Sequence, residues 1–294
     1  MTPDPSRESL EGALAALRPR LHRYCARMTG SVIDGEDVVQ EALLKAFEAL
    51  PQAGAIGHLE SWLVRIAHNA ALDFLRRRAR RNSVLSDEDP DMIIDPAPMA
   101  AEEIAAASLT SFMQLPTAQR SSVILMDVLG YSLEEITGIT GNTLPAVKAA
   151  LHRGRARLRE LAREHDSRPL PVLGEAERTR LAAYIDRFNA RDFDTLRDML
   201  ADEVQLELVS RLRRKGRAEV GNYFSNYSGI GGWELVPGLV ERRPAALVRD
   251  PSNPGGAPLY FILLEWAAGS VVGIRDFRYA RYVTECAEWV VSEQ

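Results

Sequence analysis

Proline and glycine are scarce in residues 8–81 outside two short stretches, 28–36 and 51–57. Both residues disfavour helix interiors, so their scarcity predicts a series of helices over residues 8–81. Apolar side chains recur there at three- and four-residue intervals, the spacing that buries one face of a helix. We expect Asp34 to cap a helix that begins near Gly35. The apolar positions are Val38, Val39, Ala42, Leu43, Ala46, Phe47 and Leu50, followed by Trp62, Ile66, Ala70 and Leu72 to Leu75.

A second helical stretch, residues 102–165, carries start and stop signals at close spacing. Pro116 begins a helix that we expect to run to Leu129, where a glycine follows and stops it. Ser132 and Glu135, three residues apart, form a capping box that opens a short helix. These signals predict several short helices rather than one long helix.

A tight turn over residues 140–142 separates that short helix, Leu133 to Ile139, from a longer basic one, Thr143 to Leu161. Thr143 is the expected N-cap. A short helix, a turn with a glycine and a basic second helix make the helix-turn-helix pattern, whose second helix enters the DNA major groove. Helical hairpins of this kind also occur in proteins with no DNA role.

The net charge of −5 is distributed very unevenly. Residues 76–81 read RRRARR, and residues 148–163 carry six Lys or Arg against one Glu. Between them, residues 82–104 carry seven acids and no base. Attraction to a polyanion is local, so the two basic clusters matter more than the sum. Charge alone leaves nucleic-acid binding and ordinary solvated helix ends equally open.

Composition excludes several classes of protein. A chain of 294 residues suits two or three small domains, and no run of 18 apolar residues predicts a membrane span. Cys25 and Cys286 lie far apart, which gives no disulfide framework and no cysteine-based metal site. The first residues lack a signal-peptide pattern, so we expect a cytoplasmic protein with no membrane partner, no metal and no cofactor.

The pattern changes after a second linker at residues 166–174. Residues 175–200 predict two helices, and a short helix is expected around 217–227. Helices followed by a run of strands predict an α+β domain with a bent antiparallel sheet over residues 175–294. The predicted strands are Val204 to Val209, Trp233 to Val240, Leu259 to Trp266 and Val271 to Val283.

Two segments resemble a known family. Residues 37–48 read DVVQEALLKAFE and residues 62–78 read WLVRIAHNAALDFLRRR, and both closely resemble regions 2.2 to 2.4 of extracytoplasmic-function (ECF) sigma factors. Residues 115–159 resemble region 4 of the same family, in the right order. The resemblance implies two all-α domains, region 2 at 8–81 and region 4 at 102–165. The acidic segment 82–101 would be the flexible linker between them.

The resemblance also implies partners and site residues. One face of the 37–48 helix would dock on the β′ clamp helices of core RNA polymerase, and region 4 would meet the β flap. The docking residues would be Asp37, Gln40, Glu41 and Leu44, although an ordinary amphipathic helix presents a similar polar face.

For promoter double-stranded DNA, the resemblance assigns two sets of residues. The −10 set is Arg65, Asn69, Asp73, Arg76, Arg77 and Arg78. Within it, Asp73 lies among basic residues and is expected to orient an arginine rather than touch DNA. Trp62 is a candidate for stacking on a base, although a tryptophan that opens an apolar helical stripe more often lies in the core. The loop around 52–60 would hold a base flipped from the melted non-template strand. The −35 set is Thr143, Lys148, Ala149, His152, Arg153, Arg155 and Arg157, the last three on phosphates.

The last domain resembles the SnoaL-like branch of the NTF2-like superfamily, an α+β cone with a pocket inside a curved sheet. A candidate pocket, with room for an unknown small ligand, would use Trp233, Tyr260, Asp276 and Arg278. All five histidines precede residue 166, so no acid–base pair is evident and we expect no catalytic residue. The domain would instead regulate the chain through an intramolecular contact with the sigma domains.

Two alternatives stay open at this point. One is a helix-turn-helix regulator with a ligand-sensing C-terminal domain, which leaves the 37–48 helix unexplained. The other is an NTF2-like enzyme fused to a DNA-binding domain, which needs a catalytic pair that the sequence does not offer.

Overall fold

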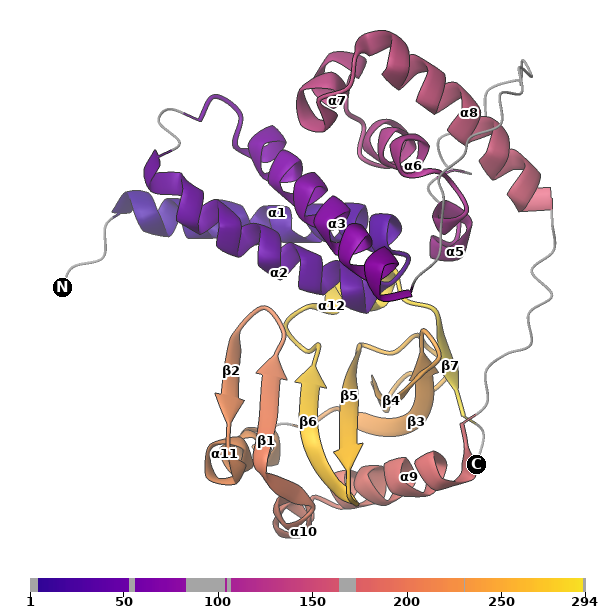
Figure 1. The fold of residues 1–294 in the computed structure, drawn as a ribbon. Coiled ribbons are helices and arrows are strands. Elements are labelled where there is room, and N and C mark those ends of the chain that lie inside the picture. The colour runs from indigo at the N-terminus through magenta and orange to yellow at the C-terminus, as the bar shows by residue number, and fades with distance from the viewer. Residues whose placement is uncertain are drawn as a thin grey trace. The chain divides into compact units, whose positions relative to one another are not determined.

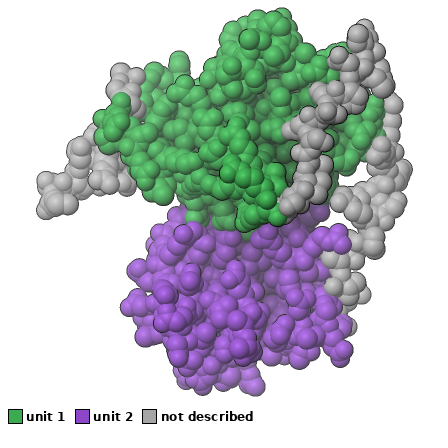
Figure 2. Space-filling view, viewed as in Figure 1, with its two compact units in different colours: residues 1–167 green, residues 168–294 purple. Residues whose placement is uncertain are grey.

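The computed structural model describes residues 5–52, 56–82, 104, 107–163, 173–229 and 231–292. The chain divides into two units, residues 1–167 and 168–294, which Figure 2 colours separately. The predicted linkers lie almost entirely outside the described residues. No helix in the described ranges is both long and apolar enough to cross a membrane.

Unit 1 begins with three helices, α1 (Pro5–Thr29), α2 (Val32–Ala49) and α3 (Leu59–Asn82), with the short η1 (Leu50–Gln52) after α2. Gly35 lies at a close approach of α1 and α2, since a Cβ there would stand 2.6 Å from the Ala26 Cα. The cap of α2 corrects the prediction. Ser31, not Asp34, is the N-cap, and its hydroxyl accepts from the Asp34 N–H. A hydroxyl just before the first turn reaches that N–H, which leaves Asp34 to favour the helix dipole.

The second half of unit 1 contains α5 (Leu109–Met113), α6 (Thr117–Val123), the π-helical η2 (Ile124–Val128), α7 (Leu133–Thr140) and α8 (Leu144–Arg163), shown in Figure 1. The capping box of Ser132 and Glu135 is confirmed. Gly130 and Gly141 adopt positive φ angles of 75° and 74°, which explains the stop after η2 and the tight turn. The helix expected to run unbroken to Leu129 ends instead in a π turn.

The helices of unit 1 share one core. Buried side chains of α1, α2 and α3 form a single cluster with those of α5 to α8, including Tyr24, Phe112 and Leu151. Arg120 of α6 is buried and donates to three backbone carbonyls, Met28 at 2.7 Å, Leu115 at 2.8 Å and Met113 at 3.2 Å. Because Met28 belongs to α1, this arginine joins the two helical halves.

Unit 2 is an α+β domain built on a bent sheet, and Figure 1 shows α9 and α10 along one end of it. The helices are α9 (Glu175–Asn189), α10 (Phe193–Asp198), α11 (Arg217–Ser228) and α12 (Arg281–Glu285). The strands are β1 (Leu200–Leu208), β2 (Leu212–Lys215), β3 (Glu234–Val240), β4 (Arg243–Arg249), β5 (Tyr260–Ala267), β6 (Ser270–Asp276) and β7 (Trp289–Val291). Their order across the sheet is β2-β1-β6-β5-β4-β3-β7.

The sheet differs from the prediction in three ways. It is mixed, because β1 pairs with β6 in parallel while its other described pairs are antiparallel. Strands β2, β4 and β7 were not predicted. Strand β2 is short and polar, β4 begins with Arg-Pro, and β7 has only three residues, and each of these features weakens a strand signal. The last predicted strand, Val271 to Val283, ends at Asp276, and residues 281–285 form α12.

Candidate nucleic-acid interface

Helix α2 presents an apolar pair to solvent. Leu44 is 60% exposed and Phe47 is 40% exposed, although large apolar side chains elsewhere on α2 are buried. Asp37 is exposed beside them, and Gln40 and Glu41 are half-buried. The sequence interpretation missed Phe47. Its place three residues after Leu44, on the same helix face, was the signal that could have found it.

Helix α3 aligns the predicted −10 residues along one side. Arg65, Asn69 and Asp73 follow one another at four-residue spacing, and Arg76 comes three residues later, so they share a face. Arg65 and Asn69 are exposed. Trp62 is half-buried and packs against the core of unit 1, as predicted.

The arginines at the end of α3 already have protein partners. Arg77 Nη2 lies 2.7 Å from Glu41 Oε2, and Lys45 Nζ lies 2.8 Å from the other oxygen of that carboxylate. Arg76 pairs with Asp73 at 3.1 Å, so Asp73 does hold an arginine. Arg78 donates to the Thr29 carbonyl at 3.2 Å.

These contacts link the candidate polymerase face to the candidate DNA face. Glu41 lies on α2 and Arg77 on α3, and the arginine and lysine beside the Glu41 carboxyl hold its pKa below the usual range. Exposed ion pairs contribute at most about 1 kcal/mol each. Exchanging either partner of such a pair for another charged group therefore costs little free energy.

Thr143, directly before α8, is exposed, as are Lys148 and His152 of the helix, while Ala149 and Arg153 are partly covered. The Thr143 hydroxyl accepts from the Ala146 N–H at 3.4 Å, the geometry of the expected cap. The opposite face packs into the core through Val147, Leu151 and Leu158. The outer face can thus meet DNA while the inner face holds the helix.

Arg155, which was predicted to bind a phosphate, has a protein partner in this structure. Its Nε and Nη2 donate to the two carboxylate oxygens of Asp127 on η2, at 2.9 and 2.6 Å. Asp127 is only 7% exposed, so this bidentate pair fixes α8 against η2. Arg157 remains at the surface, paired with Glu160 at 2.9 Å.

In unit 2 the four candidate pocket residues meet around one buried tyrosine, Tyr227 of α11. The Tyr227 hydroxyl donates to Asp276 Oδ2 at 2.6 Å and lies 3.2 Å from the Tyr260 hydroxyl. The Trp233 ring centroid lies 5.5 Å from the Tyr227 ring. The Arg278 guanidinium stands over the same ring at 5.2 Å, and its backbone N–H donates to Asp276 Oδ1 at 2.8 Å.

Two further hydroxyls complete this cluster, and sequence reasoning missed both. Tyr223 donates to Asp276 Oδ2 at 2.9 Å. Tyr184 of α9 is fully buried, and its pKa is raised mainly by that burial and to a smaller extent by the Asp276 charge. Tyr223 and Tyr227 stand four residues apart on α11, which was the available signal. Burial raises the pKa of Asp276, while its tyrosine donors act in the opposite direction.

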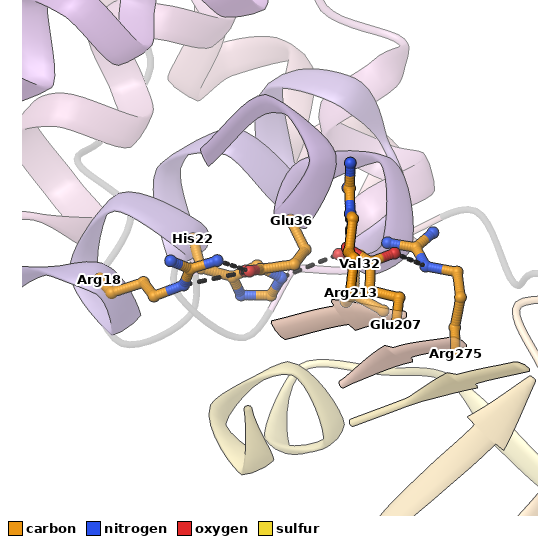
Figure 3. Close-up of polar contacts among 7 residues, drawn as sticks. All are labelled: Arg18, His22, Val32, Glu36, Glu207, Arg213 and Arg275. Carbon is orange, nitrogen blue, oxygen red and sulfur yellow. Dashed lines mark hydrogen bonds and ion pairs between the residues drawn. The ribbon is translucent and has the colours of Figure 1, made fainter. Parts of the chain in front are cut away.

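Figure 3 shows two other polar clusters, one in each unit. In unit 1, Arg18 pairs with the buried Glu36 carboxylate, and His22 Nε2 lies 2.9 Å from the Val32 carbonyl. In unit 2, Glu207 of β1 forms ion pairs with Arg213 and Arg275, each at 2.8 Å. Each cluster neutralises a carboxylate with limited exposure.

Comparison with known proteins identifies the class. The family described as Sigma-70 region 2 matches residues 14–81, and the family described as Sigma-70, region 4 matches residues 109–158. This chain is 34% identical to the ECF RNA polymerase sigma factor SigM of Mycobacterium tuberculosis, over 48% of this chain and 71% of that protein. It is 30% identical to the RNA polymerase sigma factor CarQ of Myxococcus xanthus, over 55% of this chain and 93% of CarQ.

The two matches in this order define a sigma factor of the sigma-70 type. The chain belongs to the extracytoplasmic-function RNA polymerase sigma factors. It spans 59% of another relative, SigE of Mycolicibacterium smegmatis, at 35% identity over half of this chain.

Two solved structures match this chain over different shares of its length. The M. tuberculosis extracytoplasmic-function sigma factor SigJ is 19% identical, with a TM-score of 0.37, over 90% of this chain and 95% of that one. A putative ketosteroid isomerase from Kribbella flavida is 21% identical, with a TM-score of 0.27, over 35% of this chain and 76% of that one.

Proposed function

We propose that this protein is a transcription initiation factor that binds core RNA polymerase and directs it to a two-part promoter. The observation that supports this most is the exposed pair Leu44 and Phe47 on α2, flanked by polar residues, in a chain of this family. An apolar centre with a polar rim is the composition of a protein interface. The partner would be the β′ clamp helices, with Asp37, Gln40 and Glu41 in the rim and the β flap meeting region 4.

Helix α3 would contact the −10 element. Asn69 can both donate to and accept from a base edge, and Arg65 can bind a phosphate from the same face. Arg76, Arg77 and Arg78 would exchange their present partners for phosphates of the DNA. A flipped base of the melted non-template strand would bind beside the loop 52–60, of which residues 53–55 lie outside the described part of the chain.

Helix α8 would enter the major groove of the −35 element. Lys148 and His152 are exposed near its N-terminal half, where base contacts are made, and Ala149 could pack on a thymine methyl. Arg153 and Arg157 would bind phosphates. Arg155 has a different role in this proposal, since its pair with Asp127 makes it a positioning residue.

Unit 2 would regulate the sigma domains rather than catalyse a reaction. No histidine occurs after residue 165 in the sequence, and the buried Asp276 carboxylate is already occupied by hydrogen bonds from two tyrosines and a backbone N–H. A base held in this way is poorly placed to take a proton from a substrate. We propose that the domain acts through a contact with the sigma domains, in the cytoplasm where polymerase works, and that any small ligand would change that contact.

Run-off transcription with purified core polymerase tests the proposal. Promoters would be selected from genomic fragments, and the full chain would be compared with residues 1–167. We expect both forms to initiate, with the ratio of their activities measuring the effect of unit 2. A chain that binds the selected DNA without polymerase and never initiates would instead be a conventional helix-turn-helix regulator.

A pair of variants tests the polymerase face directly. Leu44→Ala with Phe47→Ala should weaken core binding by about 10- to 100-fold, as expected when central apolar residues of an interface are truncated. Tyr279→Ala, which removes an exposed aromatic side chain in unit 2, is the matched control. Equal core affinity for both variants in fluorescence titrations would contradict the role of α2.

A further inference from the structure

The first turn of α8 carries apolar side chains at the end of the helix where base contacts are expected. Residues 144–147 read Leu-Pro-Ala-Val. Val147 is buried in the core of unit 1, whereas Leu144, Pro145 and Ala146 are exposed. Leu144 is 37% exposed, although most large apolar side chains of the described helices are buried. The turn therefore presents an apolar surface to solvent, with a leucine as its largest side chain.

Leu144 shares the outer surface of α8 with residues already proposed to contact the −35 element. Lys148 follows four residues later, so the two side chains lie along one line of the helix. Pro145, Ala149 and His152 form a second line, at spacings of four and three residues. A recognition helix contacts base edges through its N-terminal residues. Leu144, the first residue of α8, therefore has the position of a base contact.

The first turn has little capacity to bind polar groups of a base or a phosphate. The side chains of residues 144–147 carry no hydrogen-bond donor or acceptor. Pro145 has no backbone N–H. The Ala146 N–H donates to the Thr143 hydroxyl at 3.4 Å, and the Val147 N–H donates to the Thr143 carbonyl at 3.0 Å. These amides are thus directed to the residue that caps the helix, and the outward surface of the turn is apolar.

The major groove of DNA offers one apolar group to such a surface, the C5 methyl of thymine. The other base edges present hydrogen-bond donors and acceptors there. A leucine that covers a thymine methyl buries apolar surface, which favours binding. The same leucine against a guanine or cytosine edge would cover a polar group without a hydrogen bond, which disfavours binding. Leucine at this position therefore selects thymine.

The surroundings of Leu144 favour DNA over a protein as its partner. Residues 148–157 contain four basic side chains, Lys148, Arg153, Arg155 and Arg157, and no acid. A basic helix is complementary to the phosphates that flank a major groove. The centre of a protein interface, by contrast, is depleted of charged residues.

We propose that Leu144 is a specificity-determining residue for the −35 element, and that its side chain covers the C5 methyl of a thymine in the major groove. This assignment rests on the promoter-binding function proposed above. It requires a position in the −35 element at which thymine is selected for its methyl group, separately from any contact of Ala149. Lys148, one turn later on the same line, would contact a neighbouring base pair.

Deoxyuridine tests the assignment, because it lacks the C5 methyl of thymine and keeps the hydrogen-bonding groups of the base. Duplex DNA with a −35 element selected in the transcription assay would carry one deoxyuridine at each thymine in turn. Competition binding would measure its affinity for the full chain in complex with core polymerase. We expect one such substitution to weaken binding of the wild type by about 4-fold, the contribution of one buried methyl-sized group.

The variant Leu144→Ala should bind the unmodified DNA about 4-fold more weakly, and deoxyuridine at that same position should cause no further loss. Leu144 lies at the surface, and a wild-type circular dichroism spectrum would show that the variant is folded. Lys148→Ala is the matched control on the same line of α8. It should weaken binding to both DNAs and keep the 4-fold difference between them, since the leucine and the methyl both remain.

Several results would overturn the assignment alone, with the proposed function intact. These are initiation from a −35 element that lacks thymine, no effect of deoxyuridine on the wild type, or an undiminished effect at every position in Leu144→Ala. Normal DNA binding by Leu144→Ala with weaker binding to core polymerase would place Leu144 in a protein interface instead. A wild-type chain that never initiates transcription would overturn the proposed function, and this assignment with it.

Discussion

At the scale of single residues, burial decides how the titratable groups of unit 1 behave. His68 of α3 is buried beside Tyr24, whose hydroxyl lies 2.6 Å from the His68 Nδ1. Burial, with a smaller effect from Arg76, lowers the pKa of His68 to about 4. The unfolded chain therefore binds a proton before the folded one as the pH falls from about 6.5. Stability is full above that pH and is lost progressively toward pH 4.

We predict that His68 lowers the free energy of unfolding of unit 1 by about 2 kcal/mol between pH 7 and pH 5, because its pKa differs between the folded and the unfolded chain. Hydrogen-exchange protection of the α1 and α3 amides, corrected for intrinsic rates, would measure it. His68→Gln should reduce the pH dependence by that amount, and His152→Gln on the exposed face of α8 should not. Equal slopes in wild type and His68→Gln would contradict the assignment.

The buried tyrosine cluster of unit 2 makes a second prediction at this scale. Tyr227→Phe removes one of the donors to the Asp276 carboxylate while keeping the ring. The buried carboxylate would lose one of its hydrogen bonds, so we expect the free energy of unfolding to fall by about 1–3 kcal/mol. Urea unfolding of unit 2 would measure it. Tyr279→Phe, at a position that is 44% exposed, should change stability by less than about 0.5 kcal/mol.

At the scale of elements, close helix packing depends on single glycines. Gly154 lets α8 approach α6, since a Cβ at this position would lie 2.7 Å from Val123 Cγ2 and 3.3 Å from Gln119 Cβ. Glycine at position 154 therefore lowers the helix propensity of α8 but permits its close contact with α6. The same contact sets the orientation of the outer face that carries Lys148 and His152.

We predict that Gly154→Ala destabilises unit 1 by about 1–2 kcal/mol, because overpacking outweighs the gain in helix propensity. Gly138→Ala is the matched control, since it lies within α7 with nothing inside 4 Å of the new methyl. Gly138→Ala should stabilise unit 1 by about 0.5–1 kcal/mol, because alanine has the higher helix propensity. Thermal unfolding would compare the two, and Val123→Ala should restore part of the loss in Gly154→Ala. A stabilising Gly154→Ala would mean that α6 and α8 are less tightly packed than described.

At the scale of the whole molecule, the chain is two units with separate interiors. Unit 2 has its own buried aromatic cluster, in which Phe188 contacts Phe193, Phe224 and Tyr227. A region with its own core and a nearly complete set of strand pairs meets the usual conditions for independent folding.

We predict that residues 168–294, produced alone, unfold in one cooperative transition. Near-ultraviolet circular dichroism would follow the buried tyrosines during urea unfolding. A broad, non-cooperative transition would show that this unit needs residues 1–167 to fold.

Local features of the sequence determined the helices and the helix-turn-helix of this protein. A capping box such as Ser132 with Glu135, or a positive φ angle at Gly141, acts within one turn of the chain, so neighbouring residues suffice to predict it. The family resemblance likewise depended on contiguous segments. The same local signals failed for short polar strands such as β2, whose hydrogen bonds come from a partner strand.

Only the tertiary structure decided which charged groups meet. Arg77 and Glu41 are 36 residues apart in sequence, Arg155 and Asp127 are 28 apart, and Tyr131 and Glu60 are 71 apart. An arginine-rich segment predicts a basic surface. It does not predict which acid each arginine contacts, because different folds would bring different acids close to it. The choice among them depends on how the helices pack, because a side-chain hydrogen bond forms only within about 3.2 Å. That packing paired Arg155 with Asp127 and brought the Tyr131 hydroxyl to Glu60.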